Sequence, residues 1–219
     1  MFDLEGPSRP PASGGRPKRL VLLLHGYGAN GDDLIGLADP LGPLLPDAAF
    51  HSPNAPYPCD GNPYGYQWFG ISRLDPALML AGVRGAAPFV DSFLDGLLEE
   101  YGLTESETAL VGFSQGTMMS LHVGLRRKRA LAGIVGFSGL LPGAEILKDE
   151  IRTHPPVLLV HGDSDDMVPA AAMGRAEAAL AANGVAVETH LSRGVGHGID
   201  QGGLEKCARF LARHLGGGR

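Results

Sequence analysis

The sequence contains little of what several classes of protein depend on. Only two cysteines, Cys59 and Cys207, occur in 219 residues, and they lie far apart in the chain. This spacing argues against a disulfide framework or a thiolate metal site, so we expect two free thiols in a reducing compartment. A net charge of −6 gives the surface no general attraction to nucleic acid or to anionic membranes.

Long apolar segments are also scarce. Residues 1–18 contain proline, glycine, serine and arginine but no apolar run of the length of a signal peptide. The apolar run at residues 20–24 is far too short to cross a bilayer. These two observations predict a cytoplasmic protein with no stable membrane insertion.

The pattern of the whole chain predicts one α/β domain. Residues 1–18 are expected to form a flexible arm, because their prolines and glycines leave little apolar surface to bury. In residues 19–219, strand-like runs alternate with helical patterns, which indicates a mostly parallel, doubly wound sheet with helices on both faces. The ligand site of such a sheet lies at the carboxyl ends of its strands. Strands are expected at residues 20–24, 48–51, 108–111, 131–137, 156–161 and 185–191, and helices at 81–101, 117–125, 170–182 and 204–215.

The chain is organised around residues 112–116, with the sequence Gly-Phe-Ser-Gln-Gly, between an apolar run and a helical run. A strand that turns at once into a helix around Gly-x-Ser-x-Gly forms a nucleophile elbow, which exposes the serine side chain. Gly112 and Gly116 are needed there because the two backbones pass too close for a Cβ atom. A serine hydroxyl is a weak nucleophile near neutral pH, so Ser114 needs a base and an acid that orients the base.

Candidates for both groups follow later strands. His197 lies in a glycine-rich segment before the last helix, and three aspartates, Asp163, Asp165 and Asp166, follow the strand at 156–161. The order serine, acid, histidine is the order of an α/β-hydrolase. The basic run at 126–129 follows the helix after Ser114, where cations complement the negative helix end.

These motifs resemble the bacterial carboxylesterase and acyl-protein thioesterase family, the phospholipase/carboxylesterase branch of the α/β-hydrolases. The similarity runs in the correct order from about residue 20 to the C-terminus. The matching stretches are residues 24–28, 32–34, 53–56, 68–69, 112–116, 119–121, 136–139, 161–169 and 196–197.

The resemblance implies a role for each site residue. Ser114 would be the nucleophile and His197 the general base and then the acid. The family's His-Gly-x-x-Asp-x-x-Val-Pro spacing selects Asp165 to orient the imidazole, with Asp163 and Asp166 as its rivals. Backbone N–H groups of Tyr27 and Gln115 would form the oxyanion hole. The resemblance implies no metal and no cofactor.

Several further residues are expected around the substrate or beneath it. Trp68 and Phe69 lie near the end of a long aromatic loop at 52–70, which is either functional or a packed surface cover. If the loop is functional, these two side chains are expected to form the walls of the substrate pocket. The apolar stretch at 74–80, broken by proline, is either a lid over an acyl pocket or core at a helix entrance, and Leu78 and Met79 would touch the substrate. Ser138 is expected to pack beneath the site.

The sequence therefore predicts a serine carboxylesterase that hydrolyses acyl esters or thioesters of small molecules through an acyl-enzyme. Two alternative enzyme activities are those of a lysophospholipase and of an acyl-protein thioesterase. From another class, the fold could serve a non-catalytic ligand-binding protein. Family members often associate through surfaces near the site, which leaves a homodimer open. Gly70 and Thr117 depart from the family's usual aspartate and glycine, so the pocket wall is expected to differ.

Overall fold

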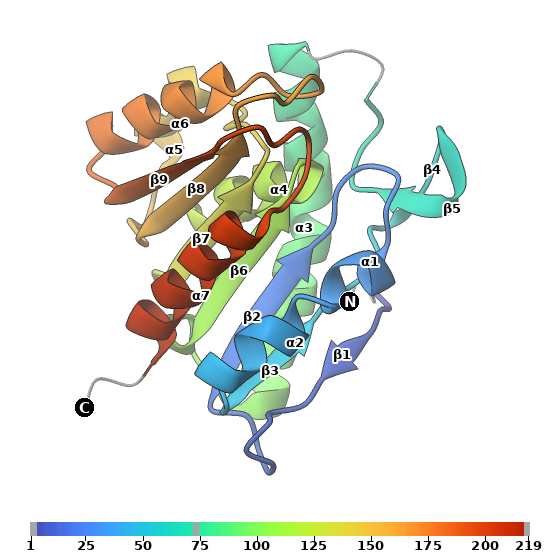
Figure 1. Cartoon of the computed structure of the whole chain (residues 1–219), viewed down its shortest axis with the longest axis vertical. Helices are drawn as coiled ribbons and strands as arrows, with labels where there is room; N and C mark the ends of the chain where they lie inside the picture. Colours follow the sequence, from blue (N-terminus) through green and yellow to red (C-terminus); the bar gives the residue numbers. More distant parts are fainter. Residues whose placement is uncertain (1–3, 72–74, 217–219) are drawn as a thin grey trace.

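The structure, a computed structural model, describes residues 4–71 and 75–216 and is built on one seven-stranded sheet (Figure 1). The strand order is β1-β3-β2-β6-β7-β8-β9, and every neighbouring pair is parallel except β1 with β3. This confirms the predicted α/β fold with a mostly parallel sheet. The strands are β1 Ser8–Arg9, β2 Arg19–Leu24, β3 Ala48–His51, β6 Thr108–Phe113, β7 Gly133–Phe137, β8 Val157–Gly162 and β9 Val187–Ser192.

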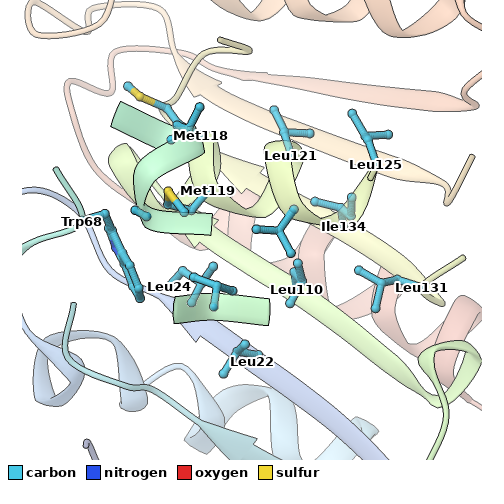
Figure 2. Packing of buried hydrophobic residues seen from close by; sticks show 14 of the residues in the cluster. Leu22, Leu24, Trp68, Leu110, Met118, Met119, Leu121, Leu125, Leu131 and Ile134 are labelled. Atoms are coloured by element: carbon cyan, nitrogen blue, oxygen red, sulfur yellow. The ribbon is translucent and has the colours of Figure 1, made fainter. Parts of the chain in front are cut away.

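Helices cover both faces of this sheet (Figure 1). Successive side chains of a strand point to opposite faces, so Leu22 and Leu24 of β2 join one apolar cluster while Val21 and Leu23 join the other. Figure 2 shows part of the first cluster. Its helices are α3 Pro76–Tyr101, α4 Gln115–Gly124 and α6 Ala171–Ala182, and those of the second are α1 Gly31–Ile35, α2 Ala38–Leu41 and α7 Gln201–Leu215. Shorter helices are η1 Gly42–Leu44, η2 Glu105–Glu107, η3 Ala144–Ile146 and α5 Leu147–Glu150.

The direction in which the chain adds strands to the sheet reverses at β2. The chain passes from β2 to β3 on one side, and then returns to β6 on the other side of β2 before it continues outward through β7, β8 and β9. Loops that leave β2 and β6 therefore diverge at the carboxyl edge of the sheet. Ligands of open parallel sheets bind at such a reversal.

The N-terminal arm differs from its expected loose state. In its described part, Ser8 and Arg9 pair with β3, and the Glu5 and Pro7 carbonyls accept hydrogen bonds from backbone N–H groups of residues 54 and 52 at 2.7 and 3.0 Å. Leu4 is buried in the first apolar cluster. Backbone pairing to a sheet edge needs few apolar side chains, which is why composition did not reveal it. The boundary between residues 18 and 19 stays a prediction.

Residues 52–70 form more than a loop. They contain a two-stranded antiparallel sheet, β4 Tyr57–Cys59 and β5 Asn62–Gln67, and Tyr66 also pairs with Ala29 in the loop after β2. Proline and glycine obscured these strands in the sequence, because both residues are depleted from strands in general. The hairpin lies beside the loop that follows β2 (Figure 1).

Helix α3 begins five residues earlier than expected, at Pro76. The Asp75 carboxylate accepts hydrogen bonds from the N–H groups of Ala77 and Leu78 at 3.0 and 3.2 Å, and proline occupies the first position of the helix. Asp-Pro is a signal for the start of a helix, whereas from the sequence we interpreted this proline as a break in the apolar stretch. Residues 76–80 therefore form the first turn of α3, in agreement with the helix-entrance alternative, and Leu74 lies outside the described residues.

Among the described helices, α3 alone is long and apolar enough, by length and composition, to cross a membrane. It packs against α4. Its buried side chains belong to the apolar cluster that also contains residues of β2 and α4: Met79, Val83, Ala86, Val90, Leu94, Leu97 and Leu98.

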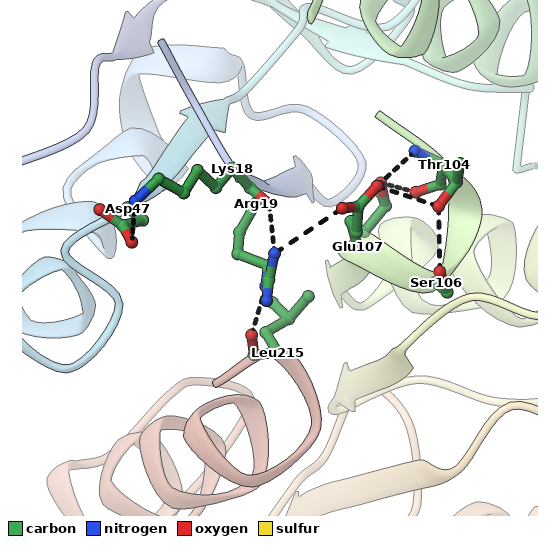
Figure 3. A network of polar contacts seen from close by, with 8 residues as sticks. Lys18, Arg19, Asp47, Thr104, Ser106, Glu107 and Leu215 are labelled. Carbon is green, nitrogen blue, oxygen red and sulfur yellow. Dashed lines mark hydrogen bonds and ion pairs between the residues drawn. The ribbon is translucent and has the colours of Figure 1, made fainter. Parts of the chain in front are cut away.

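Polar contacts tie the edge of the sheet opposite the carboxyl ends to its surroundings (Figure 3). Arg19, the first residue of β2, donates to the Leu215 carbonyl at the end of α7 at 2.5 Å and lies 3.8 Å from the Glu107 carboxylate. Lys18 pairs with Asp47 at 3.2 Å. These contacts hold the start of β2 against α7 and η2, so β2 is anchored at the end opposite its carboxyl end.

The basic run after α4 has partners within the fold. Arg126 donates to the His122 carbonyl at 3.1 Å, in the last turn of α4, and pairs with Glu150 at 2.6 Å. The side chain of Arg127 is 7% exposed and pairs with three carboxylates on α3 and η2: Asp91, Asp95 and Glu105. The first two residues of the run therefore join helices, in agreement with its structural interpretation, while Lys128 and Arg129 are exposed.

Replacing Arg127 with methionine should lower the free energy of unfolding by about 2 to 3 kcal/mol. Breaking a fully buried ion pair typically costs about 3 to 5 kcal/mol; the expected loss is smaller because Asp91 and Asp95 remain exposed to solvent. Urea unfolding measures the change. The control Arg209→Ala removes an exposed pair with Glu205 at 3.7 Å and should cost under about 0.5 kcal/mol. Equal losses in both variants would contradict the prediction.

Candidate active site

The turn between β6 and α4 has the strained geometry of a nucleophile elbow. Ser114 has φ +53° and ψ −111°, a conformation that costs free energy in a non-glycine residue. Its N–H is held by the Phe137 carbonyl at 2.8 Å. A Cβ on Gly112 would lie 2.3 Å from the Gly116 carbonyl oxygen, and one on Gly116 would lie 1.8 Å from the Leu24 oxygen. Both glycines are therefore required sterically, as the sequence predicted.

Three side chains from separate loops meet at this elbow. His197, between β9 and α7, has Nε2 at 3.0 Å from Ser114 Oγ and Nδ1 at 2.8 Å from Asp165 Oδ2. The Phe113 ring lies against the imidazole, with ring centroids 5.0 Å apart. Since the carboxylate can only accept, Nδ1 carries the proton and Nε2 is free to accept the serine proton. This arrangement can activate a serine for attack on a carbonyl.

Asp165 occupies an environment that keeps its carboxylate ionised. Its side chain is fully buried, and Oδ1 accepts hydrogen bonds from the N–H groups of Met167 and Val168 at 2.9 and 2.8 Å. Burial by itself raises the pKa of this carboxyl, but the hydrogen bonds from Val168, His197 and Met167 outweigh it and hold the pKa below its ordinary value. The charge remains available to stabilise a protonated His197.

The other two aspartates of the loop are exposed. Asp163 accepts hydrogen bonds from the Gly194 N–H at 2.7 Å and from Ser164 Oγ at 2.9 Å, which fixes the loop between β9 and His197. Asp166 has no hydrogen bond or ion pair among the described residues. Of the three candidates, only Asp165 contacts the imidazole of His197.

Two backbone N–H groups beside Ser114 remain available for a ligand. Within residues 4–71 and 75–216, neither the Tyr27 nor the Gln115 N–H donates to a protein acceptor. Gln115 is the first residue of α4, where the helix dipole favours negative charge. A Cβ on Gly26 would lie 3.3 Å from Ser114 Cβ, so the loop after β2 is pressed against the elbow. The two N–H groups can serve a developing oxyanion.

Thr117 and Ser138 pack beneath the elbow. The Thr117 hydroxyl lies 2.9 Å from the Gly112 carbonyl and 2.8 Å from the Phe137 carbonyl, so it joins the ends of β6 and β7. Room for its side chain comes from Gly136, where a Cβ would lie 2.5 Å from Thr117 Cγ2. Ser138 is fully buried and donates to the carbonyl of residue 198 at 3.3 Å, in agreement with its expected packing role.

The expected pocket walls divide into buried and exposed residues. Trp68 is wholly buried and Phe69 is 7% exposed, with the Phe69 ring packed on α3 at Gly82. Neither residue lines the cavity beside Met79; Trp68 has no exposed surface with which to form a pocket wall, whereas a wall role for Phe69 stays a prediction. Leu78 is 45% exposed, whereas Met79 is buried and lines a cavity of about 360 Å³. The other residues that line this cavity are Pro76, Leu140, Leu141, Pro142, Gly143, Ala144, Glu145, Val168, Pro169, Ala172, Arg175 and Ala176.

This cavity is mainly apolar and lies between the first turn of α3, the segment after β7, and α6. Val168, which holds Asp165 through its N–H, forms part of its wall. The described residues contain no group of three or more histidine, cysteine, aspartate or glutamate side chains that could hold a metal ion.

The chain was compared with known proteins. A family model described as "Phospholipase/Carboxylesterase" matches residues 11–215. Esterase YpfH of Escherichia coli (strain K12) is 28% identical over 215 residues, which cover 98% of this chain and 86% of that protein. The crystal structure of esterase PE8 is 46% identical with a TM-score of 0.93, and the match covers 97% of this chain and 99% of that one. Acyl-protein thioesterase 2 of Zea mays is 26% identical with a TM-score of 0.74, over 96% and 100% of the two chains.

Proposed function

Because this chain belongs to the phospholipase/carboxylesterase family, and is a carboxylic ester hydrolase of the α/β-hydrolase fold, we propose that Ser114 is its nucleophile. The observation that carries the proposal is the continuous hydrogen-bonded series from Ser114 Oγ through His197 to Asp165. His197 Nε2 removes the hydroxyl proton while Oγ attacks the carbonyl carbon. The carbonyl oxygen becomes an oxyanion, held by the N–H groups of Tyr27 and Gln115.

The tetrahedral intermediate then collapses in the ordinary way of a serine esterase. The bond to the leaving alcohol or thiol breaks, and that group takes the proton from His197. The acyl group remains on Ser114 as an ester. Water, deprotonated by His197, attacks this ester, and the bond between the acyl carbon and Ser114 Oγ breaks to release the acid. Protonated His197 then returns the proton to Ser114 Oγ. Every proton moves through His197 Nε2, so no cofactor is needed for the reaction.

We further propose that the apolar cavity beside Met79 receives the acyl chain. Burial of each CH₂ group contributes about 0.8 kcal/mol, which is roughly a fourfold gain in kcat/KM. A series of 4-nitrophenyl esters from acetate upward should therefore show kcat/KM rising with chain length until the cavity is filled. A flat profile, or the highest activity on charged acids, would contradict the proposal.

A pair of variants tests the location of the chain. Ala172→Leu fills part of the cavity and should lower the ratio of kcat/KM for octanoate to that for acetate by about 15- to 60-fold, since two to three CH₂ groups lose their space. Leu78→Ala removes an exposed side chain from the same end of α3 and should leave this ratio unchanged. An unchanged ratio in Ala172→Leu would place the acyl chain elsewhere.

An acyl-protein thioesterase activity also fits, because a thioester presents the same acyl group to the same serine and such thioesterases are among the relatives. A lysophospholipase remains a second alternative within enzymes. A fluorophosphonate separates either enzyme from a non-catalytic binding protein, since only an activated serine reacts with it. Labelling lost in Ser114→Ala would support the enzyme.

We propose that the protein acts in the cytoplasm on a small-molecule ester or acyl substrate and has no stable membrane insertion. One observation supports a reducing compartment: Cys59 and Cys207 are both buried and unpaired. A homodimer is an open alternative, which analytical ultracentrifugation would test.

A further inference from the structure

The side chain of Gln115 makes contacts that the reaction described above does not use. It is wholly buried. Its Oε1 accepts the Trp68 N–H at 2.9 Å, and its Nε2 donates to the Phe69 carbonyl at 2.7 Å. One primary amide thus satisfies one backbone donor and one backbone acceptor of a segment 46 and 47 residues away in the chain. Only glutamine and the shorter asparagine carry an acceptor oxygen and a donor NH₂ group on the same carbon.

Trp68 carries the connection onward to the loop after β2. Its indole N–H donates to the His25 carbonyl at 3.0 Å, and the two rings lie 5.6 Å apart. The His25 imidazole accepts the Ala55 N–H at Nε2 at 2.9 Å, so its proton is on Nδ1, which donates to the Gly26 carbonyl at 2.7 Å. Burial lowers the pKa of His25 and keeps it neutral, as this arrangement requires.

The two ends of this connection are the two halves of the oxyanion hole. Gln115 supplies one N–H from the elbow, and Tyr27 supplies the other from the loop two residues after His25. Donors accelerate the reaction only if they are held in position before charge develops. On its inner side the loop is held by the elbow, because Gly116 touches the Leu24 carbonyl. On its outer side it is held by Trp68.

We propose that the Gln115 side chain is a positioning residue that fixes the distance between the two oxyanion donors, through Trp68 and His25. The proposal rests on the proposed function, in which Tyr27 and Gln115 bind the oxyanion. It explains why Trp68 is buried and bonded at both its backbone and indole N–H groups, although the sequence predicted a pocket wall. It also assigns a catalytic consequence to a buried side chain whose two hydrogen bonds go to the backbone of residues 68 and 69.

Gln115→Met keeps the backbone N–H and removes both side-chain hydrogen bonds. We expect kcat for 4-nitrophenyl acetate to fall by about 10- to 100-fold, less than the loss of a whole donor, with KM changed less than about threefold. A trifluoromethyl ketone, whose adduct with Ser114 carries an oxyanion, should bind more weakly by a similar factor. A merely structural role would not link these two losses.

Two further variants keep the test informative if Gln115→Met folds poorly. Gln67→Met is the matched control, because Gln67 is also buried. Within the described residues its amide bonds only to Asp60 in the β4–β5 hairpin, at 3.1 and 3.5 Å. Stability should therefore fall without a selective loss of kcat. Gln115→Glu can donate to the Phe69 carbonyl only while protonated. Its activity relative to wild type should therefore fall as pH rises through ionisation of Glu at position 115.

The proposal is overturned if Gln115→Met loses no more kcat than Gln67→Met, or if the Gln115→Glu to wild-type ratio is independent of pH. Labelling of Ser114 by a fluorophosphonate is measured in parallel on each protein. Absence of Ser114 labelling in the wild type would reject the proposed nucleophile itself, which distinguishes that failure from the failure of the positioning role. Circular dichroism checks that each variant is folded at the assay temperature.

Discussion

Replacing Ser114 with alanine should lower kcat for a 4-nitrophenyl ester by about 10⁴- to 10⁶-fold. Among the described residues, the substitution removes the only hydroxyl that His197 Nε2 contacts, at 3.0 Å, so the acyl-enzyme route is closed. The residual rate would come from the oxyanion donors and substrate binding alone. Steady-state hydrolysis measured together with fluorophosphonate labelling checks both the rate and the identity of the nucleophile.

The same series tests whether serine and histidine act as one unit. His197→Ala should lower kcat by about as much as Ser114→Ala. The double variant should be no slower than either single variant, because each single substitution already abolishes the acyl-enzyme route. Additive losses would mean that the two residues act in separate steps.

Ser138→Ala is the control, since Ser138 is the other described serine with positive φ and, unlike Ser114, is fully buried. Its hydroxyl makes one long hydrogen bond to a loop carbonyl, so we expect less than a roughly tenfold loss. Activity retained in Ser114→Ala would refute the elbow assignment.

Replacing Asp165 with asparagine should lower kcat by about 10⁴-fold. The amide is similar in size to the carboxylate, but its nitrogen would face His197 Nδ1 or displace the N–H donors of Met167 and Val168. It also removes the negative charge that stabilises protonated His197. In contrast to Ser114→Ala, the serine is still present, so fluorophosphonate should label this variant slowly rather than not at all.

Asp163 and Asp166 provide the controls within the same loop. Asp166→Asn should retain kcat within about twofold, because solvent screens the interaction of an exposed carboxylate with the positive charge that forms on His197. Asp163→Asn weakens the acceptor of the Gly194 N–H and should reduce kcat by under tenfold, through looser placement of the His197 loop. A 10⁴-fold loss in Asp163→Asn with full activity in Asp165→Asn would reverse the assignment.

Much of the fold could be predicted because its signals are local and repeated. The apolar run of β2 and the alternation of strands and helices reflect burial on both faces of a parallel sheet, which every strand of the core must satisfy. Likewise, the elbow requires glycines at 112 and 116 for steric reasons that hold within five residues. The predicted beginnings and ends of the core elements are mostly within three residues of those observed.

The elements that sequence reasoning missed depend on partners elsewhere in the chain. Strand β1 exists because β3 offers an unpaired edge, and the β4–β5 hairpin is joined to the loop after β2 through Tyr66 and Ala29. Nothing in the composition of either segment reveals these partners. The start of α3 is a different case, since Asp75-Pro76 is a local signal that the sequence did contain.

The sequence by itself determined the chemical groups of the site and the order in which the chain presents them. The serine between glycines, the aspartate spacing and the late histidine are local patterns, set by bonded neighbours. Tertiary structure alone decided which groups are within hydrogen-bond distance: it buried Asp165 against His197 and left Asp163 and Asp166 in solvent. It also turned Trp68 from an expected pocket wall into a buried link between Gln115 and His25. Distances of about 3 Å between residues tens of positions apart arise from packing of the whole core, and no short stretch of sequence encodes them.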